Sequence, residues 1–148
     1  MLSSRARYAV RAILDLSVRE DQGPIQSTDI AARQLIPIDF LQQILGDLKS
    51  AHLVETRRGP MGGYFLARRA KEITLGEVIR LMDGPIAPIS CVSVTQFAEC
   101  GCPEPDSCPL RRTFKQVRDS MSSVFDNVSF AELASRQGQM AIQGSANL

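Results

Sequence analysis

The sequence predicts a mainly α-helical protein with a small β-hairpin, in which a winged helix-turn-helix is followed by a long dimerisation helix. Three observations predict it. Apolar residues recur at helical spacing over the first fifty residues and again over 110–125. A Gly/Pro-rich loop near residue 60 separates two short β-prone runs. All four cysteines lie between the second β-prone run and the helical segment over 110–125, in a stretch of 18 residues.

Three helices are predicted ahead of the hairpin. The first covers about residues 4–20 and ends before Gly23-Pro24. The second runs through Gln34, with Ser27 as its expected N-cap because a serine hydroxyl can accept a free backbone N–H. After a turn at 35–37, the third covers 38–51. Its expected apolar stripe is Phe40, Leu41, Ile44, Leu45 and Leu48.

The rest of the chain is predicted in the order hairpin, helix, irregular loop and two helices. Thr74 to Glu77 matches a capping box that opens a helix to about residue 82, and Ser129 to Glu132 matches a second. Five of the eight prolines lie in 84–109, which predicts a loop. The expected organisation is therefore a DNA-binding domain over 1–83, a cysteine loop over 84–109, a dimerisation helix and a short helix over 110–135, and a flexible tail over 136–148.

Charge favours a nucleic-acid partner for the N-terminal half. The net charge is only +1, but residues 1–71 carry 11 Lys/Arg against 7 Asp/Glu, and residues 72–148 carry 6 against 9. No apolar run is long enough to span a membrane and no signal-peptide pattern is present, so we expect a cytoplasmic protein without a membrane partner. The single histidine, His52, and the scattered carboxylates form no catalytic arrangement, so we expect no enzyme activity.

A helix that reads the major groove needs exposed polar side chains near its N-terminus. Gln42 and Gln43 can pair with adenine edges, Lys49 can reach a phosphate, and an arginine of the hairpin can enter the minor groove. The alternative is that the helices and hairpin form a protein-interaction module or a plain scaffold. The predicted DNA-binding residues are Ser27, Thr28, Asp39, Gln42, Gln43, Lys49, Arg57 and Arg58.

The cysteines follow the pattern Cys91-x8-Cys100-x-Cys102-x5-Cys108. Thiolates are soft ligands for iron–sulfur clusters or zinc, and structural zinc sites usually show close C-x2-C pairs that are missing here. The spacing favours a cluster, while a zinc site, a thiol switch and unliganded cysteines stay open.

The long helix after the cysteine loop carries an apolar stripe on a segment that leaves the domain. Its residues are Phe114, Val117, Met121 and Val124. We expect this stripe to bury a symmetric dimer interface.

Several motifs in this order resemble the IscR/NsrR/CymR family of winged-helix transcriptional regulators. They are Arg7-Tyr8-Ala9-Val10, the wing from Arg58 to Tyr64, the block from Ile73 to Ile79, and Cys102-x5-Cys108. The resemblance covers about residues 1–135. It implies a homodimer on a pseudo-palindromic operator of double-stranded DNA, read through Gln42, Gln43 and Asp39 with insertion of Arg58. It also implies that a 2Fe–2S or 4Fe–4S cluster is bound by cysteines of the loop.

The chain departs from the cluster-binding members at three positions. Ten residues separate Cys91 from Cys102, more than in those members. Where two member types place a histidine or an acidic fourth ligand, this chain has Arg111 and Arg7. Cys100 is therefore the candidate fourth ligand beside Cys91, Cys102 and Cys108.

The regulator would sense iron, redox state or nitric oxide, because cluster damage would release the loop that leads into the dimer helix. One alternative is a metal-free regulator of the same family that responds to a metabolic enzyme or a small-molecule effector. Another is a thiol-redox or metal-trafficking protein.

Overall fold

The computed structural model describes residues 2–146 and has the predicted fold class. Helix α1 (Ser4–Val18) and the 3-10 helix η1 (Glu20–Gln22) precede α2 (Ser27–Gln34) and α3 (Ile38–Ser50). Strands β1 (Val54–Arg57) and β2 (Gly63–Leu66) form the hairpin, followed by the 3-10 helix η2 (Ala70–Glu72) and α4 (Leu75–Asp83). The 3-10 helix η3 (Ser90–Val92), α5 (Pro109–Asn127) and α6 (Phe130–Ala146) complete the chain.

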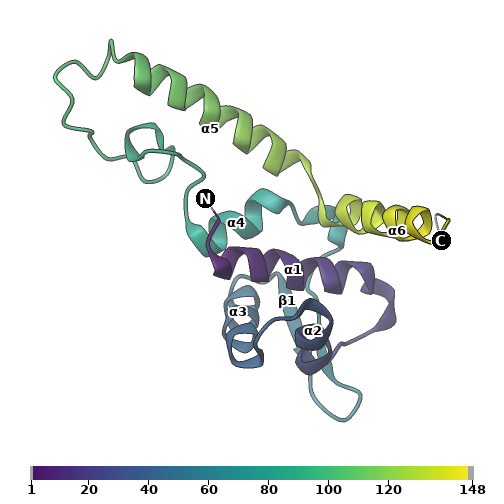
Figure 1. The fold of residues 1–148 in the computed structure, drawn as a ribbon. Coiled ribbons are helices and arrows are strands. Elements are labelled where there is room, and N and C mark those ends of the chain that lie inside the picture. Colours follow the sequence, from purple (N-terminus) through teal and green to yellow (C-terminus); the bar gives the residue numbers. More distant parts are fainter. Residues whose placement is uncertain (1, 147–148) are drawn as a thin grey trace.

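Helix α1 is the centre of the core. Its buried face begins with small residues, Ala6, Ala9 and Ala12, which allow α3, α4 and α6 to pack closely around it. Ile13 and Leu16 continue this face. The core therefore holds the three helices of the helix-turn-helix unit together with α4 and the start of α6 (Figure 1).

The hairpin is joined to the segment before α2 by an additional bridge. β1 and β2 pair antiparallel, with Val54 opposite Leu66 and Arg57 opposite Gly63. Ile25 then bridges Tyr64 through two backbone hydrogen bonds of 2.8 Å. Gly63 lies beside this bridge with φ 147°, and a Cβ there would overlap the Ile25 backbone. The wing and the entry to α2 are thus fixed relative to each other.

The chain returns to the core after α5. Thr74 and Ser129 form a bridge, and the Phe130 amide donates to the Ile73 carbonyl at 3.0 Å. Phe130 is fully buried. Helix α6 therefore packs on α1 although the sequence places it after α5.

Three local predictions were wrong. Ser27 is not an N-cap but the first residue of α2, whose N-cap Gln26 makes no side-chain cap bond. Phe40 is 39% exposed, because it lies at the edge of the α3 stripe, where it meets the Tyr8 ring edge-on at 5.7 Å. The last helix does not end near residue 135, because α6 continues to Ala146 through the expected tail; residues 147–148 lie outside the described chain.

Of the two hydrogen bonds that each capping box predicts, only the one to the hydroxyl is confirmed. The Thr74 hydroxyl accepts from the Glu77 amide at 3.2 Å, and the Ser129 hydroxyl accepts from the Glu132 amide at 3.2 Å. The carboxylates do not return the bond, because Glu77 pairs with Arg68 and Glu132 with Arg136. The hydroxyl alone therefore caps each helix.

Helix α5 and the loop before it extend away from the core (Figure 1). None of the described α5 side chains is buried. Between α4 and the start of α5 at Pro109, η3 is the one helix among the described residues. No helix in the described part of the chain is long and apolar enough to cross a membrane.

Candidate nucleic-acid interface and cysteine site

The helix-turn-helix exposes the side chains that were predicted to read DNA. Leu41, Ile44, Leu45 and Leu48 turn one face of α3 into the core. Because a helix turns about 100° per residue, the polar residues between them fall on the other side. Asp39, Gln42 and Gln43 are accordingly all exposed. On α2, Thr28 is exposed and Ser27 is half-buried.

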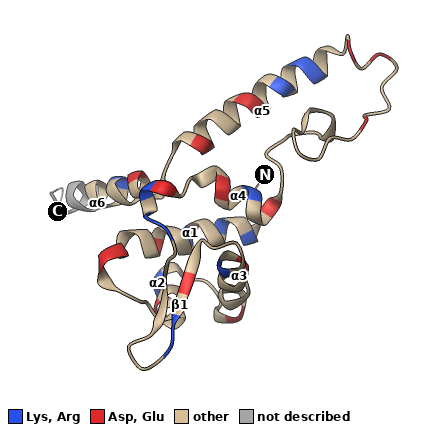
Figure 2. Ribbon diagram, turned by 180° about the vertical axis from the view of Figure 1, so that it is seen from behind, with Lys and Arg blue, Asp and Glu red and all other residues tan. Residues whose placement is uncertain are grey.

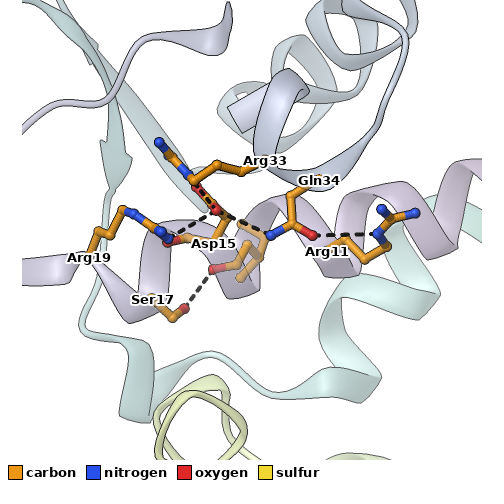
Figure 3. A network of polar contacts seen from close by, with 7 residues as sticks. Arg11, Asp15, Ser17, Arg19, Arg33 and Gln34 are labelled. Atoms are coloured by element: carbon orange, nitrogen blue, oxygen red, sulfur yellow. Dashed lines mark hydrogen bonds and ion pairs between the residues drawn. The ribbon is translucent and has the colours of Figure 1, made fainter. Parts of the chain in front are cut away.

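A buried carboxylate fixes α2 against α1 (Figure 3). Asp15 is 1% exposed and lies on the apolar face of α1. The Arg33 guanidinium donates to both of its oxygens, at 2.7 and 3.0 Å, and Arg19 and Gln34 donate to Oδ1. The hydrogen bond from Arg33 to Asp15 also raises the pKa of Arg33. Two hydrogen-bonded side chains of α2 thereby set the position of the helix-turn-helix on its supporting helix.

The wing tip is a tight turn that carries two exposed arginines, Arg57 and Arg58. The Gly62 amide donates to the Gly59 carbonyl at 2.9 Å, and a Cβ on Gly62 would overlap the Arg57 carbonyl oxygen. The Arg57 guanidinium lies 5.9 Å from the centre of the Phe65 ring. The turn therefore presents Arg58 on a short, constrained loop.

Two charged side chains of α3 have partners within the chain. Lys49 is exposed, and its ammonium donates to the Thr56 hydroxyl at 2.9 Å. Asp47 pairs with Arg5 of α1. Figure 2 shows basic segments on α1 and on the arms of the wing. The Arg5 pair therefore offsets the charge of the Asp47 carboxylate on this surface.

The loop brings three of the four cysteines to one pocket. Cys91, Cys100 and Cys102 line a pocket of about 330 Å³ together with Arg111. Cys108 lines the neighbouring pocket, and its sulfur caps α5 by accepting from the Arg111 amide at 3.5 Å. Among the described residues, no three His, Cys, Asp or Glu side chains are arranged to hold a metal ion. The donors are thus close together but not placed in a ligating geometry.

The three pocket thiols affect one another. Burial raises the pKa of Cys91, which is 5% exposed. The hydrogen bond between Cys100 and Cys102 lowers the pKa of Cys100 and raises that of Cys102 to about 11. Gly101 between them has φ 66°, which gives the sharp bend that brings the two neighbours together.

Helix α5 has two adjacent faces. Arg111, Phe114, Arg118 and Phe125 are half-buried and follow one another at helical spacing. Next to them an apolar stripe is exposed, with Leu110 at 66%, Val117 at 41%, Met121 at 37% and Val124 at 59%. Phe114 therefore lies at the border of the predicted dimer stripe, and Leu110, which the prediction left out, extends it.

Two ion pairs were missed at the sequence level. Asp15 interrupts the apolar face of α1, and a charge at such a position could have indicated a buried partner. The second pair links α4 to α5: Arg80 donates to both oxygens of Asp126, at 2.5 and 2.9 Å. A Cβ on Gly76 would overlap the Asp126 carboxylate, so this glycine allows the two helices to approach.

Comparison with known proteins agrees with this geometry. The Rrf2 family, described as iron-dependent transcriptional regulators, matches residues 2–136. The chain is 32% identical over 143 residues to the HTH-type transcriptional regulator IscR of Escherichia coli K12, covering 97% of this chain and 85% of the relative.

Solved structures give the same result. CymR, the global cysteine regulator of B. subtilis, has a TM-score of 0.77 at 29% identity, covering 92% of this chain and 97% of that one. IscR of T. potens has a TM-score of 0.74 at 27% identity, covering 93% and 88%. These relatives are transcriptional regulators and not enzymes. The chain belongs to the Rrf2 family of transcriptional regulators.

Proposed function

We propose that two copies of this chain bind a pseudo-palindromic DNA operator, and that an iron–sulfur cluster on the cysteine loop controls the affinity. One observation carries the proposal: all four cysteines lie in the segment that connects the DNA-binding unit to α5. A change in this loop can therefore alter how two DNA-binding units are placed relative to each other. Half-site spacing makes operator affinity sensitive to that placement.

The surface of α3 and the wing supports DNA as the partner. Gln42 and Gln43 are exposed on α3, and the constrained wing presents Arg58. Glutamine amides can pair with adenine edges in the major groove, and an arginine suits the negative potential of a narrow minor groove. The same face would make supporting contacts to the DNA backbone through Thr28, Lys49 and Arg57.

The exposed stripe of α5 supports a homodimer. An apolar groove of about 560 Å³ runs beside it, between α5 and the segment after α4, and includes Val117 and Met121. A monomer would leave this groove and the stripe exposed to water. Soluble monomeric proteins rarely expose contiguous apolar surfaces of this kind. A second copy would cover both in a symmetric contact.

The donor set of the loop fits a cluster in its chemistry. Cys91, Cys100 and Cys102 already share one pocket, and Cys108 lies at the start of α5 beside it. The shared pocket supports Cys100 as the fourth ligand next to the other three. When bound, a 2Fe–2S or 4Fe–4S cluster would supply a redox-sensitive crosslink between Cys91 and the start of α5. Its loss, oxidation or nitrosylation would free the loop.

Anaerobic purification of wild type and of each cysteine variant tests the cluster. Cys91→Ala, Cys102→Ala and Cys108→Ala should each abolish the visible chromophore and the bound iron and sulfide, and Cys100→Ala should weaken or lose them. Ser107→Ala is the matched control in the same loop. Full iron content in Cys102→Ala or Cys108→Ala would exclude the cluster assignment, and an unaltered Cys100→Ala would exclude Cys100 alone.

Operator binding tests the DNA face. Arg58→Ala should weaken binding broadly, whereas Gln42→Ala should weaken it at one base step by about 1–3 kcal/mol if the contact is bidentate. Glu55→Gln, on the exposed side of β1, is the control. Wild-type affinity in both variants on a selected operator would show that the reading surface lies elsewhere.

A metal-free regulator is the second candidate. It is favoured by the likeness to CymR at a TM-score of 0.77 and by the thiols of the described loop, which are not arranged to ligate a metal. In that case the protein would be colourless after anaerobic purification and would still bind DNA specifically. Neither the contacts of the described residues nor the names of the relatives support a metabolic enzyme as the effector.

A further inference from the structure

The cysteine loop contacts α5 through two arginines on one face of that helix. Arg111 lies in the first turn, where its guanidinium is 5.9 Å from the centre of the Phe97 ring and donates to the Pro105 carbonyl at 3.3 Å. Arg118 lies two turns later, and its Nη1 donates to the Val92 carbonyl at 2.5 Å. The two contacts hold different parts of the loop, and the second holds the turn that carries Cys91.

The Arg118 contact is the better defined of the two. Its side chain is 15% exposed, while that of Arg111 is 32% exposed. Asp119 accepts from Nε and Nη2 of Arg118, which leaves Nη1 directed at the Val92 carbonyl. A planar guanidinium can make both contacts at once, and a lysine ammonium cannot reproduce that geometry.

The turn that Arg118 holds is the longest buried run of the loop. Cys91, Val92 and Ser93 are 5%, 4% and 8% exposed, whereas Cys100 and Cys102 are exposed. The turn is closed by the Val92 amide donating to Ile89 and the Ser93 amide donating to Ser90, at 3.3 and 3.0 Å. It packs against α5. Arg118 therefore joins the turn that carries Cys91 to the middle of α5.

We infer that Arg118 is the positioning residue that transmits the state of the Cys91 turn to the dimerisation helix. The expected effect on DNA binding rests on the proposed function. The link between the Cys91 turn and α5 rests on the hydrogen bond from Arg118 to the Val92 carbonyl. Arg118 is neither a cluster ligand nor part of the proposed DNA face. Without it the loop could still bind its cofactor, but the change in the Cys91 turn would no longer reach the middle of α5.

The first test uses the protein without any cofactor. Arg118→Ala should raise the hydrogen-exchange rates of the Val92 and Ser93 amides by about tenfold or more, because the turn loses its anchor on α5. Amides of α1 and α3 should keep their rates. Asp119→Asn should have a smaller effect, because Arg118 remains but is less well oriented. Unchanged exchange of both amides in Arg118→Ala would overturn the inference.

The second test compares operator affinity with and without iron–sulfide reconstitution, at one salt concentration. In Arg118→Ala the ratio of the two dissociation constants should fall to within about twofold of one, with wild-type iron content. In Arg118→Lys this ratio of dissociation constants should also fall most of the way to one. A wild-type ratio in Arg118→Ala would overturn the inference. If wild type itself takes up no iron or shows no ratio, the proposed function fails, and the exchange experiment still decides the contact.

Discussion

The DNA-binding unit and the segment over 84–127 differ in how completely a single chain buries their side chains. Helix α1 is surrounded by α3, α4 and α6 and buries a continuous face, with Asp15 fully hydrogen-bonded inside it. Helix α5 buries none of its described side chains, and most of the loop before it is exposed. The proposed recognition surface is thus formed within a single chain, whereas in our proposal a second copy and a loop ligand would complete the segment over 84–127.

The largest expected effect comes from a charge on the exposed stripe of α5. Val117→Glu should prevent dimer formation, because it would bury a carboxylate between two apolar surfaces. Loss of the second half-site contact should weaken operator binding by about a hundredfold. Sedimentation measures the dimer and fluorescence anisotropy measures the binding.

Two controls separate the dimer from the fold in this prediction. Ser123→Glu lies about 120° around α5 from Val117, away from the apolar stripe, and should remain dimeric. The melting of the N-terminal unit in Val117→Glu should resemble wild type, because Val117 contributes nothing to the core. A dimeric Val117→Glu protein would show that α5 does not form the interface.

The next effect concerns the buried carboxylate of the DNA-binding unit. Asp15→Ala leaves Arg33, Arg19 and Gln34 without their acceptor and should lower the free energy of unfolding by about 3 kcal/mol. The value lies at the low end for a broken buried pair because both arginines are partly exposed. Urea unfolding measures it, with the exposed Asp29→Ala as control. A loss below about 1 kcal/mol would mean that the network does not hold α2 in place.

A smaller effect is expected where the two regions meet. The ion pair with Arg80 lowers the pKa of Asp126 below its ordinary value of 3.8, so the pair stabilises the folded protein above that value and is lost as pH falls through the lowered pKa. Both side chains are over a third exposed, so Asp126→Asn should cost less than about 1 kcal/mol at pH 7.

The pH dependence checks this assignment. The difference in melting temperature between wild type and Asp126→Asn should shrink as pH falls below about 4. Asp106→Asn, in the exposed loop, is the control. A difference that persists unchanged at low pH would mean that the substitution acts through packing and not through the charge of Asp126.

The smallest expected effect is a stabilisation within the DNA-binding unit. Leu35 ends α2 in the left-handed region, with φ 51°, and its side chain is 81% exposed. Leu35→Gly relieves the left-handed strain but adds freedom to the unfolded chain, for a net gain of about 0.5 kcal/mol. Thermal melting measures it. A clear loss of stability would show that the Leu35 side chain has a packing role.

The fold could be predicted because its elements depend on local pattern. The α3 stripe, the glycine-rich wing and the Thr74 cap each follow from residues close together in the sequence. The return of α6 to α1 could not be predicted, because it depends on the bridge between Thr74 and Ser129, which are far apart along the chain. The extension of α6 to Ala146 was missed because the composition after residue 136, with Gly138 in it, favours no helix by itself.

The candidate site divides in the same way. Helical periodicity and turn chemistry were enough to place Gln42, Gln43 and Arg58 on the exposed surface. Cysteine spacing identified the loop but not the shared pocket of Cys91, Cys100 and Cys102, since an irregular loop has no period from which to place side chains. Arg118 gave no signal in the sequence, because its partner is a backbone carbonyl.

The most direct test of the central claim is an anaerobic operator titration of one preparation in two states, reconstituted with iron and sulfide and stripped by a chelator. Salt and protein concentration are held constant. The two dissociation constants should differ by about tenfold or more, while both states stay folded and dimeric. Equal dissociation constants, with iron bound in the reconstituted state, would contradict control of DNA binding by the cysteine loop.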